Sequence, residues 1–203
     1  TLPNHIGGLC LSATNKENKL LGFIYSIPAI ISGKTSHWSC RLAVNPRAQS
    51  LNIGNILKQA QKKACLSIGI TDIYWTYDPL ISKNAYLNIN KLNASLVGIE
   101  YDFYGIEHGH RGIIHWDLKS TANEQKFNIS KNATIVSLGD DTNLNSNQIH
   151  VKLPDNLNQK TNKDSYQKWN SHILSTLHTC LENDFTCLGI HREKDSGYSY
   201  YIF

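Results

Sequence analysis

The sequence predicts an α/β fold built on a mixed β-sheet, which contains both parallel and antiparallel strands. Short apolar segments bounded by turn-forming residues recur along the chain and are typical of strands. Residues 53–68 carry apolar side chains at spacings of three and four, the period of a helix. Between residues 36 and 118 the segments follow the order strand, helix, strand, helix, strand, strand. This order combines helical crossovers with direct hairpin connections and therefore favours mixed strand directions.

Composition narrows the class of protein. The 203 residues carry a formal net charge of +4 and are 40% hydrophobic, enough for one sizeable core, alone or with a small appendage. Lys and Arg are scattered, so we expect no nucleic-acid partner. No segment is apolar enough to cross a membrane and the chain begins without signal-peptide features, which predicts a cytoplasmic protein with no membrane partner. Five cysteines without C-x-x-C spacing indicate reduced thiols and no metal site.

The first half of the chain predicts four strands and two helices. Apolar segments 9–14 and 20–30 flank a polar turn and form a hairpin, and 36–44 is the next strand. The helix at 53–68 ends at Gly69, where a C-cap glycine belongs. Strand 71–78 stops at Pro79, which cannot donate to a ladder, and a helix follows at about 82–92.

The second half predicts further strands and one long helix. Strands are expected at 95–105 and 111–118, and again at 134–138, 148–154, 185–193 and 197–203, with a helix at 163–182. The polar segment after Leu118 has no stable period and indicates a connection. We therefore expect a core at 1–118, and a linker with a C-terminal β-α-β extension at 119–203 that packs on the core.

The segment AVNPRAQSLNIGNIL, residues 43–57, leads from a strand end through a polar loop into the helix at 53–68. A helix start leaves unpaired N–H groups and the positive end of the helix dipole, and both attract anions. This segment therefore raises the question of a phosphorylated cofactor.

Two motifs carry a resemblance to a known family. The RLAVNP run into the loop and helix, and WTYDPLISKNAYLNINKL after the next strand, resemble the GNAT superfamily of acyl-CoA-dependent N-acyltransferases. The WTYDPL segment is similar to a branch of predicted acetyltransferases with the pattern W-T-[FY]-D-P-L. The likeness covers nearly all of the chain, although the tail matches in pattern more than in residues. It implies a central mixed sheet flanked by helices with a C-terminal extension, and transfer of an acyl group, acetyl above all, from acyl-CoA to a primary amine by direct attack.

The resemblance also implies where the cofactor binds. The superfamily's pyrophosphate loop, [QR]-x-x-G-x-[GA], falls on residues 49–54, with Asn52 where the family usually has Gly. Gly tolerates a left-handed backbone there, and Asn is the next most tolerant residue. The strand backbone before the loop would pair with the pantetheine amides. The implied cofactor-binding residues are Leu42, Val44, Gln49, Ser50, Leu51, Asn52, Ile53, Gly54, Asn55, Asn84 and Asn88.

The proton donor of the superfamily is missing. Many members place a Tyr on the helix after the fifth strand to protonate the leaving thiolate, and the corresponding residue here is Ile89. Tyr86 and Asn88 lie nearby, but α-helical spacing points them to other faces. Tyr86 is the candidate acid, with a packing aromatic as its ordinary alternative. A thiol's pKa lies close enough to neutral that no enzymic acid is strictly needed.

Three residues are candidate bases. Asp78 ends a strand where ligands gather in open α/β sheets, or caps the following Asp-Pro turn. His37 alternates with Ser39 and Arg41 on one strand face that either lines an acceptor cleft or is solvated. Glu100 lies in an aromatic strand end that either walls the pocket or belongs to the core.

The expected acceptor is an amine on a small molecule or a peptide, with Arg111 and Tyr104 as substrate contacts, or with Arg111 only in an ion pair. Superfamily members begin with a strand and two helices before the hairpin, whereas the given sequence starts at what resembles the lead into the hairpin. Either an upstream segment is not represented, or the cleft is open or completed by a partner. A homodimer is a further expectation.

Two alternatives stay open, a non-catalytic module that binds CoA or a partner, and an acyltransferase with a carrier-linked donor. A strand bulge beside residues 42–44 with free N–H groups facing a cleft would favour the enzyme, whereas a cleft filled by side chains would favour the module.

Overall fold

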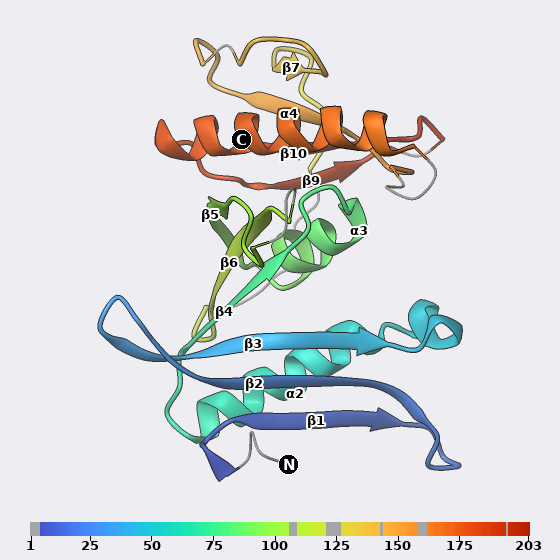
Figure 1. Cartoon of the computed structure of the whole chain (residues 1–203), viewed down its shortest axis with the longest axis vertical. Coiled ribbons are helices and arrows are strands. Elements are labelled where there is room, and N and C mark those ends of the chain that lie inside the picture. Colours follow the sequence, from blue (N-terminus) through green and yellow to red (C-terminus); the bar gives the residue numbers. More distant parts are fainter. Residues whose placement is uncertain (1–4, 106–108, 121–126, 143, 158–161, 194) are drawn as a thin grey trace. The chain divides into compact units, whose positions relative to one another are not determined.

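The computed structural model describes residues 5–105, 109–120, 127–142, 144–157, 162–193 and 195–203 (Figure 1). Contacts divide the chain into two compact units, residues 1–75 with 115–121 and residues 76–114 with 122–203. Strands β4 (Asp72–Tyr77) and β6 (Arg111–Asp117) continue from one unit into the other. The expected division of the chain at residue 118 stays a prediction.

The first unit is a sheet with one helix against it. Its elements are β1 (Leu9–Thr14), β2 (Leu20–Ile31), β3 (Lys34–Val44), the 3-10 helix η1 (Pro46–Leu51), α2 (Ile53–Ser67) and the adjoining ends of β4 and β6. Figure 1 shows β1, β2 and β3 side by side, with α2 along them. These three strands are antiparallel, whereas β3 and β4 pair in parallel. The predicted mixed α/β sheet is therefore confirmed.

The core of this unit lies between α2 and the sheet. Ile53 and Leu57 of α2 are buried against Ile24 of β2, as the helical period predicts. Gly22 allows this close approach, because a Cβ atom there would lie 2.7 Å from the Ala43 carbonyl oxygen and 3.2 Å from the Ile53 side chain. The start of α2 therefore packs directly on the β2 backbone.

Strand β3 contains a β-bulge. Tyr25 pairs with Arg41 and Ser26 pairs with Ser39, so Cys40 is an extra residue without an opposite partner. The bulge shifts the alternation of faces by one residue. A bulge near residues 42–44 is one part of the feature expected of the enzyme, and the other part, free N–H groups facing a cleft, stays a prediction. The expectation that Arg41 shares a face with Ser39 is wrong, because Arg41 is exposed and Ser39 is buried.

The second unit contains a separate four-stranded sheet. Strands β7 (Thr134–Val136), β8 (Ile149–Pro154), β9 (Gly189–Arg192) and β10 (Tyr198–Ile202) lie in the order β7-β8-β10-β9. The unit also contains α3 (Ser82–Ala85), the π-helix η2 (Tyr86–Lys91), β5 (Ser95–Glu100) and α4 (Lys163–Glu182). The predicted helix at 163–182 is confirmed by α4. Where the structure describes the chain, no helix is long and apolar enough to cross a membrane.

The helix predicted at 82–92 differs in type from the observed one. It is α-helical only as far as Ala85 and then widens, with the Leu92 N–H bonded to the Leu87 carbonyl at 3.0 Å. Consecutive side chains from Asn88 to Asn90 are all buried, which regular α-helical spacing does not allow on one narrow face. The prediction that residues near Ile89 point to other faces was therefore based on the wrong helical geometry. Such π segments often occur at functional sites.

Candidate functional site

The predicted pyrophosphate loop has a backbone suited to an anion. Asn52 takes the left-handed conformation, with φ of 58° and ψ of 20°, at the position where the GNAT pattern has Gly. Residues 49–51 belong to η1, and α2 begins at Ile53 without a side-chain N-cap. The first N–H groups of α2 are therefore available to an anion, in the arrangement that diphosphates use at helix starts.

We expect the side chain of Asn52 to matter less than its backbone. Asn52→Ala should lower the free energy of unfolding by about 1 kcal/mol, because a Cβ-bearing residue without a polar side chain is strained in the left-handed region. Asn52→Gly should stay within about 0.5 kcal/mol of the wild type, since Gly populates this region freely. Urea unfolding of the two variants measures the difference. Equal losses in both would show that the Asn52 side chain itself holds the loop.

The strand before this loop contributes core side chains and a backbone edge. Leu42 and Val44 pack against the cluster of Ile24, Ile53 and Leu57, so any contact with a cofactor would come from their backbone. Pairing of β3 with β4 covers His37↔Ile73 and Trp38↔Tyr74. In the part of the unit that the structure describes, the remainder of β3 is paired with β2 alone. Its other edge is suited to pair with amides of a ligand.

Asn55 adds an unsatisfied acceptor beside this loop. Among the described residues, no hydrogen bond reaches its buried Oδ1 atom. Because the oxygen and nitrogen of an amide are placed by their surroundings, a flipped Asn55 would present two donors at this position. Asn84 is exposed on α3, whereas Asn88 is buried and its carbonyl accepts from the Ala94 N–H.

His37 is neither solvated nor lining a cleft with Arg41. It is 1% exposed, and its Nδ1 lies 2.9 Å from the Ser26 hydroxyl on β2. Burial lowers the pKa of His37, and a hydrogen bond from the imidazole to the Gly7 backbone opposes that shift only in part. The imidazole is therefore neutral at physiological pH, as a base must be, but it is enclosed within the first unit.

Three predicted site residues come together in the second unit. The Asp78 Oδ2 atom lies 3.8 Å from the Arg111 guanidinium, which lies 5.3 Å from the Tyr104 ring. Asp78 Oδ1 accepts from the Leu80 N–H at 2.9 Å, so the capping alternative is correct for that oxygen. Both side chains of the ion pair are partly exposed.

Sequence reasoning missed Tyr166 as a member of this cluster. Its hydroxyl, on α4, donates to Asp78 Oδ2 at 3.3 Å. Burial, followed by the charge of Asp78, raises the pKa of Tyr166 to about 12. The phenol therefore stays protonated at neutral pH and remains a donor. No short-range pattern links α4 to the segment after β4, so the sequence held no signal for this contact.

Glu100 and Tyr86 lie on other elements, β5 and η2. Glu100 is exposed at the end of β5. Tyr86 borders a cavity of about 880 Å³ that is entirely within the second unit, together with Asn90, Phe127, Asp155 and His191. Ile89 is 3% exposed and belongs to the core. The roles assigned to Asp78, His37, Glu100 and Tyr86 stay predictions.

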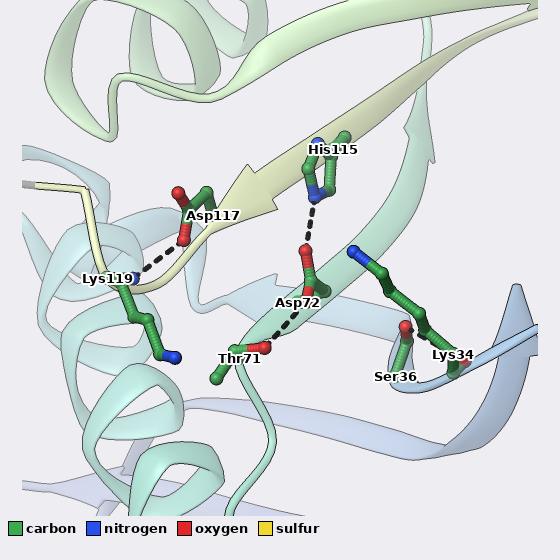
Figure 2. A network of polar contacts seen from close by, with 7 residues as sticks. All are labelled: Lys34, Ser36, Thr71, Asp72, His115, Asp117 and Lys119. Atoms are coloured by element: carbon green, nitrogen blue, oxygen red, sulfur yellow. Dashed lines mark hydrogen bonds and ion pairs between the residues drawn. The ribbon is translucent and has the colours of Figure 1, made fainter. Parts of the chain in front are cut away.

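A second polar network lies at the beginning of β4 in the first unit. Figure 2 shows His115 of β6 next to Asp72, with 2.7 Å between His115 Nε2 and Asp72 Oδ1. Thr71 donates to the other oxygen of Asp72, and His115 stacks on Tyr74 with ring centroids 4.6 Å apart. Burial alone would raise the pKa of Asp72, but hydrogen bonds from Thr71 and His115 outweigh it and lower the pKa. The pair therefore ties β4 to β6.

Across the described residues, no group of three or more His, Cys, Asp or Glu side chains is arranged to hold a metal ion. Among the buried titratable groups is Lys58 on α2, which the helical pattern alone does not distinguish from its neighbours, the half-buried Lys62 and the exposed Lys63. Lys58 is 2% exposed.

Comparison with known proteins gives similarity in fold only. No protein-family model matches the sequence, and no curated protein matches it. Solved structures that resemble it include acetyltransferases. A GNAT-family acetyltransferase from Desulfovibrio desulfuricans is 17% identical (TM-score 0.45, covering 55% of this chain and 69% of that one). Aminoglycoside 6'-acetyltransferase type Ii is 23% identical (TM-score 0.45, 56% and 71%). PaiA N-acetyltransferase from Thermoplasma acidophilum, solved with coenzyme A, is 20% identical (TM-score 0.41, 54% and 60%).

Proposed function

We propose that the chain is a GNAT-type N-acyltransferase that binds acyl-CoA through the loop at residues 49–55. One observation carries the proposal. Asn52 takes a left-handed backbone at the position where the family pattern has Gly, directly before an uncapped helix. A left-handed residue at this point aims the following N–H groups toward one side, as a diphosphate requires. The bulge at Cys40 supports the proposal, because it interrupts the regular ladder of β3 just before the strand leads into the loop.

Each part of the predicted site has a definite task in this proposal. When bound, acyl-CoA supplies a thioester carbonyl that an amine can attack directly. The N–H groups at residues 53–55 would hold the diphosphate, and the backbone of Leu42 and Val44 would pair with amides of the pantetheine arm. Asp78, whose side chain is partly exposed, and Arg111 beside it belong to the second unit, and their roles as base toward the amine and as contact for an acidic acceptor stay predictions.

Calorimetric titration with CoA, acetyl-CoA and longer acyl-CoAs tests this proposal. Wild-type protein should bind at micromolar affinity. Gly54→Trp should weaken binding at least tenfold, because an indole at the second residue of α2 fills the space before the helix start. Ile56→Trp is the matched control, since Ile56 is 52% exposed on the same helix and its substitution should leave binding unchanged. Absence of binding to the wild type would contradict the proposal.

A non-catalytic CoA-binding module is the second candidate, and a specific observation favours it. Ile89 occupies the position of the family's proton-donating Tyr and is 3% exposed, so that position offers no acid. Release of free thiol from acetyl-CoA in the presence of a panel of amines separates the two functions. Binding without thiol release, for acetyl and longer acyl donors alike, would favour the module.

A further inference from the structure

Lys58 is a charged residue inside the first unit. It is 2% exposed, on the face of α2 that packs on the sheet. Its Nζ atom donates to the Ser39 hydroxyl at 3.2 Å and to the Gln61 amide oxygen at 3.3 Å. The same atom lies 3.4 Å from the centre of the Trp75 ring on β4. A single side chain thus contacts α2, β3 and β4.

This arrangement is costly for stability and is not needed to satisfy its polar neighbours. A buried amine loses its hydration, and apolar residues of similar size are often as stable or more stable in such positions. Gln61 already donates to the Ser39 hydroxyl directly, at 3.2 Å. Ser39 and Gln61 would therefore keep a partner without Lys58. A lysine at this position is best explained by the spacing of α2 and β3 that its hydrogen bonds impose, because an apolar residue would not impose it.

We propose that Lys58 is a positioning residue of the acyl-CoA site. Lys58 joins α2 to β3 at Ser39, the last residue before the bulge. It thereby sets the distance between the start of the helix and the strand. This inference rests on the proposed function. Ser39 directly precedes the bulged Cys40. Beyond Cys40, the part of β3 that the structure describes pairs with β2 on one edge and not with β4 on the other. Gly54 lies four residues before Lys58, one helical turn away on the same face. The lysine therefore links the two backbone segments that would bind the cofactor.

The charge of Lys58 adds a signature that a purely structural residue lacks. Burial, the larger cause, lowers the pKa of Lys58 to about 7, and the Cys65 thiol on the same helix opposes this slightly. From β3 and β4, Ser39 and Trp75 face the amine, and neither ionises in this range. Lys58 therefore changes charge near neutral pH. An anionic cofactor at the start of α2 favours the ammonium form, so binding should be accompanied by proton uptake.

The test compares Lys58→Met with Lys62→Met as matched control. Lys62 lies one turn further along α2, donates to the Ser120 carbonyl and lies 5.5 Å from the Trp116 ring, so its replacement removes the same charge next to another indole. Isothermal calorimetry with CoA at pH 6.5, 7.5 and 8.5, in two buffers of different ionisation enthalpy, gives affinity and proton uptake. Hydrogen exchange of the amides of residues 39–44 reports on the strand without any ligand.

We expect Lys58→Met to remain folded, to bind CoA about tenfold more weakly at pH 6.5 and to take up less than half the wild-type protons. Its amides at residues 40–44 should exchange faster than those of the wild type. Lys62→Met should match the wild type in all three measurements. Equal CoA affinity and equal exchange in Lys58→Met and wild type would overturn the positioning role while leaving the proposed function intact. Failure of the wild type to bind CoA would overturn the proposed function, and the positioning role with it.

Discussion

Lys58→Met is expected to abolish the pH dependence of stability that Lys58 causes. In the wild type, the free energy of unfolding should rise by about 2 kcal/mol from pH 6.5 to pH 8.5 because of this residue. The pKa of Lys58 is about 7 in the folded chain, against an ordinary value of 10.5. Between these two values the unfolded chain binds one proton more than the folded chain, so stability rises with pH. Below pH 7 both states are protonated and the slope disappears. Met carries no proton in either state and contributes no slope.

Urea unfolding followed by tryptophan fluorescence measures this difference, because Trp75 lies against Lys58. The range should stop at pH 8.5, since cysteine thiols ionise above it in the unfolded chain. Burial raises the pKa of Cys65 to about 11, and its contribution to stability has the opposite sign. Lys62→Met serves again as control and should keep the wild-type slope. Parallel slopes for Lys58→Met and wild type would show that the Lys58 ammonium is solvated in the folded chain.

Asn90→Ala is expected to destabilise the second unit by about 2–4 kcal/mol. The Asn90 side chain, fully buried in η2, binds the backbone of β9 as a neighbouring strand would. Its Oδ1 accepts from the Ile190 N–H at 2.9 Å, and its Nδ2 donates to the Ile190 carbonyl at 3.1 Å. Alanine leaves both backbone groups buried without this partner, and each such loss costs about 1–3 kcal/mol.

Differential scanning calorimetry checks this effect, with two further variants as controls. Asn90→Asp keeps the acceptor for the Ile190 N–H but loses the donor, so its loss should be at least that of one hydrogen bond. Asn84→Ala changes an exposed amide six residues earlier and should cost less than about 0.5 kcal/mol. An Asn90→Ala variant as stable as Asn84→Ala would mean that β9 is held by its pairing with β10 alone.

Much of the fold could be predicted because its signals are local. The apolar period of α2, the Gly after it and the turn formers between strands each act within a few residues, and α2 and β1 to β4 were predicted to within about two residues of their ends. The strands predicted at 95–105 and 185–193 are shorter in the structure, as β5 ends at Glu100 and β9 begins at Gly189. The π-helix at Tyr86–Lys91 was not predicted, because its widening depends on burying consecutive side chains against distant elements. The bulge at Cys40 was anticipated only as a region, since one extra residue leaves the strand pattern almost unchanged.

The candidate site was predictable only in part, for the same reason. The left-handed turn at Asn52 follows from local backbone chemistry and a loop pattern. The cluster of Asp78 and Arg111 was predicted as separate residues, and Tyr166 joins it from a helix about 90 positions away. Lys58 reads as one of several helical lysines until the packing of α2 is known. Interactions of this range carry no periodic signal in the sequence.

The bulge in β3 also determines how this segment tolerates insertions and deletions. Ser39 faces α2, and so do Leu42 and Val44, although they follow Ser39 by three and five positions, which in a regular strand would place them on the opposite face. Removing Cys40 would restore regular pairing and turn both apolar side chains away from the helix. Exchanging Cys40 for another small residue would keep them in place. The length of β3, more than the identity of its bulged residue, is therefore the property that natural variation in this segment has to preserve.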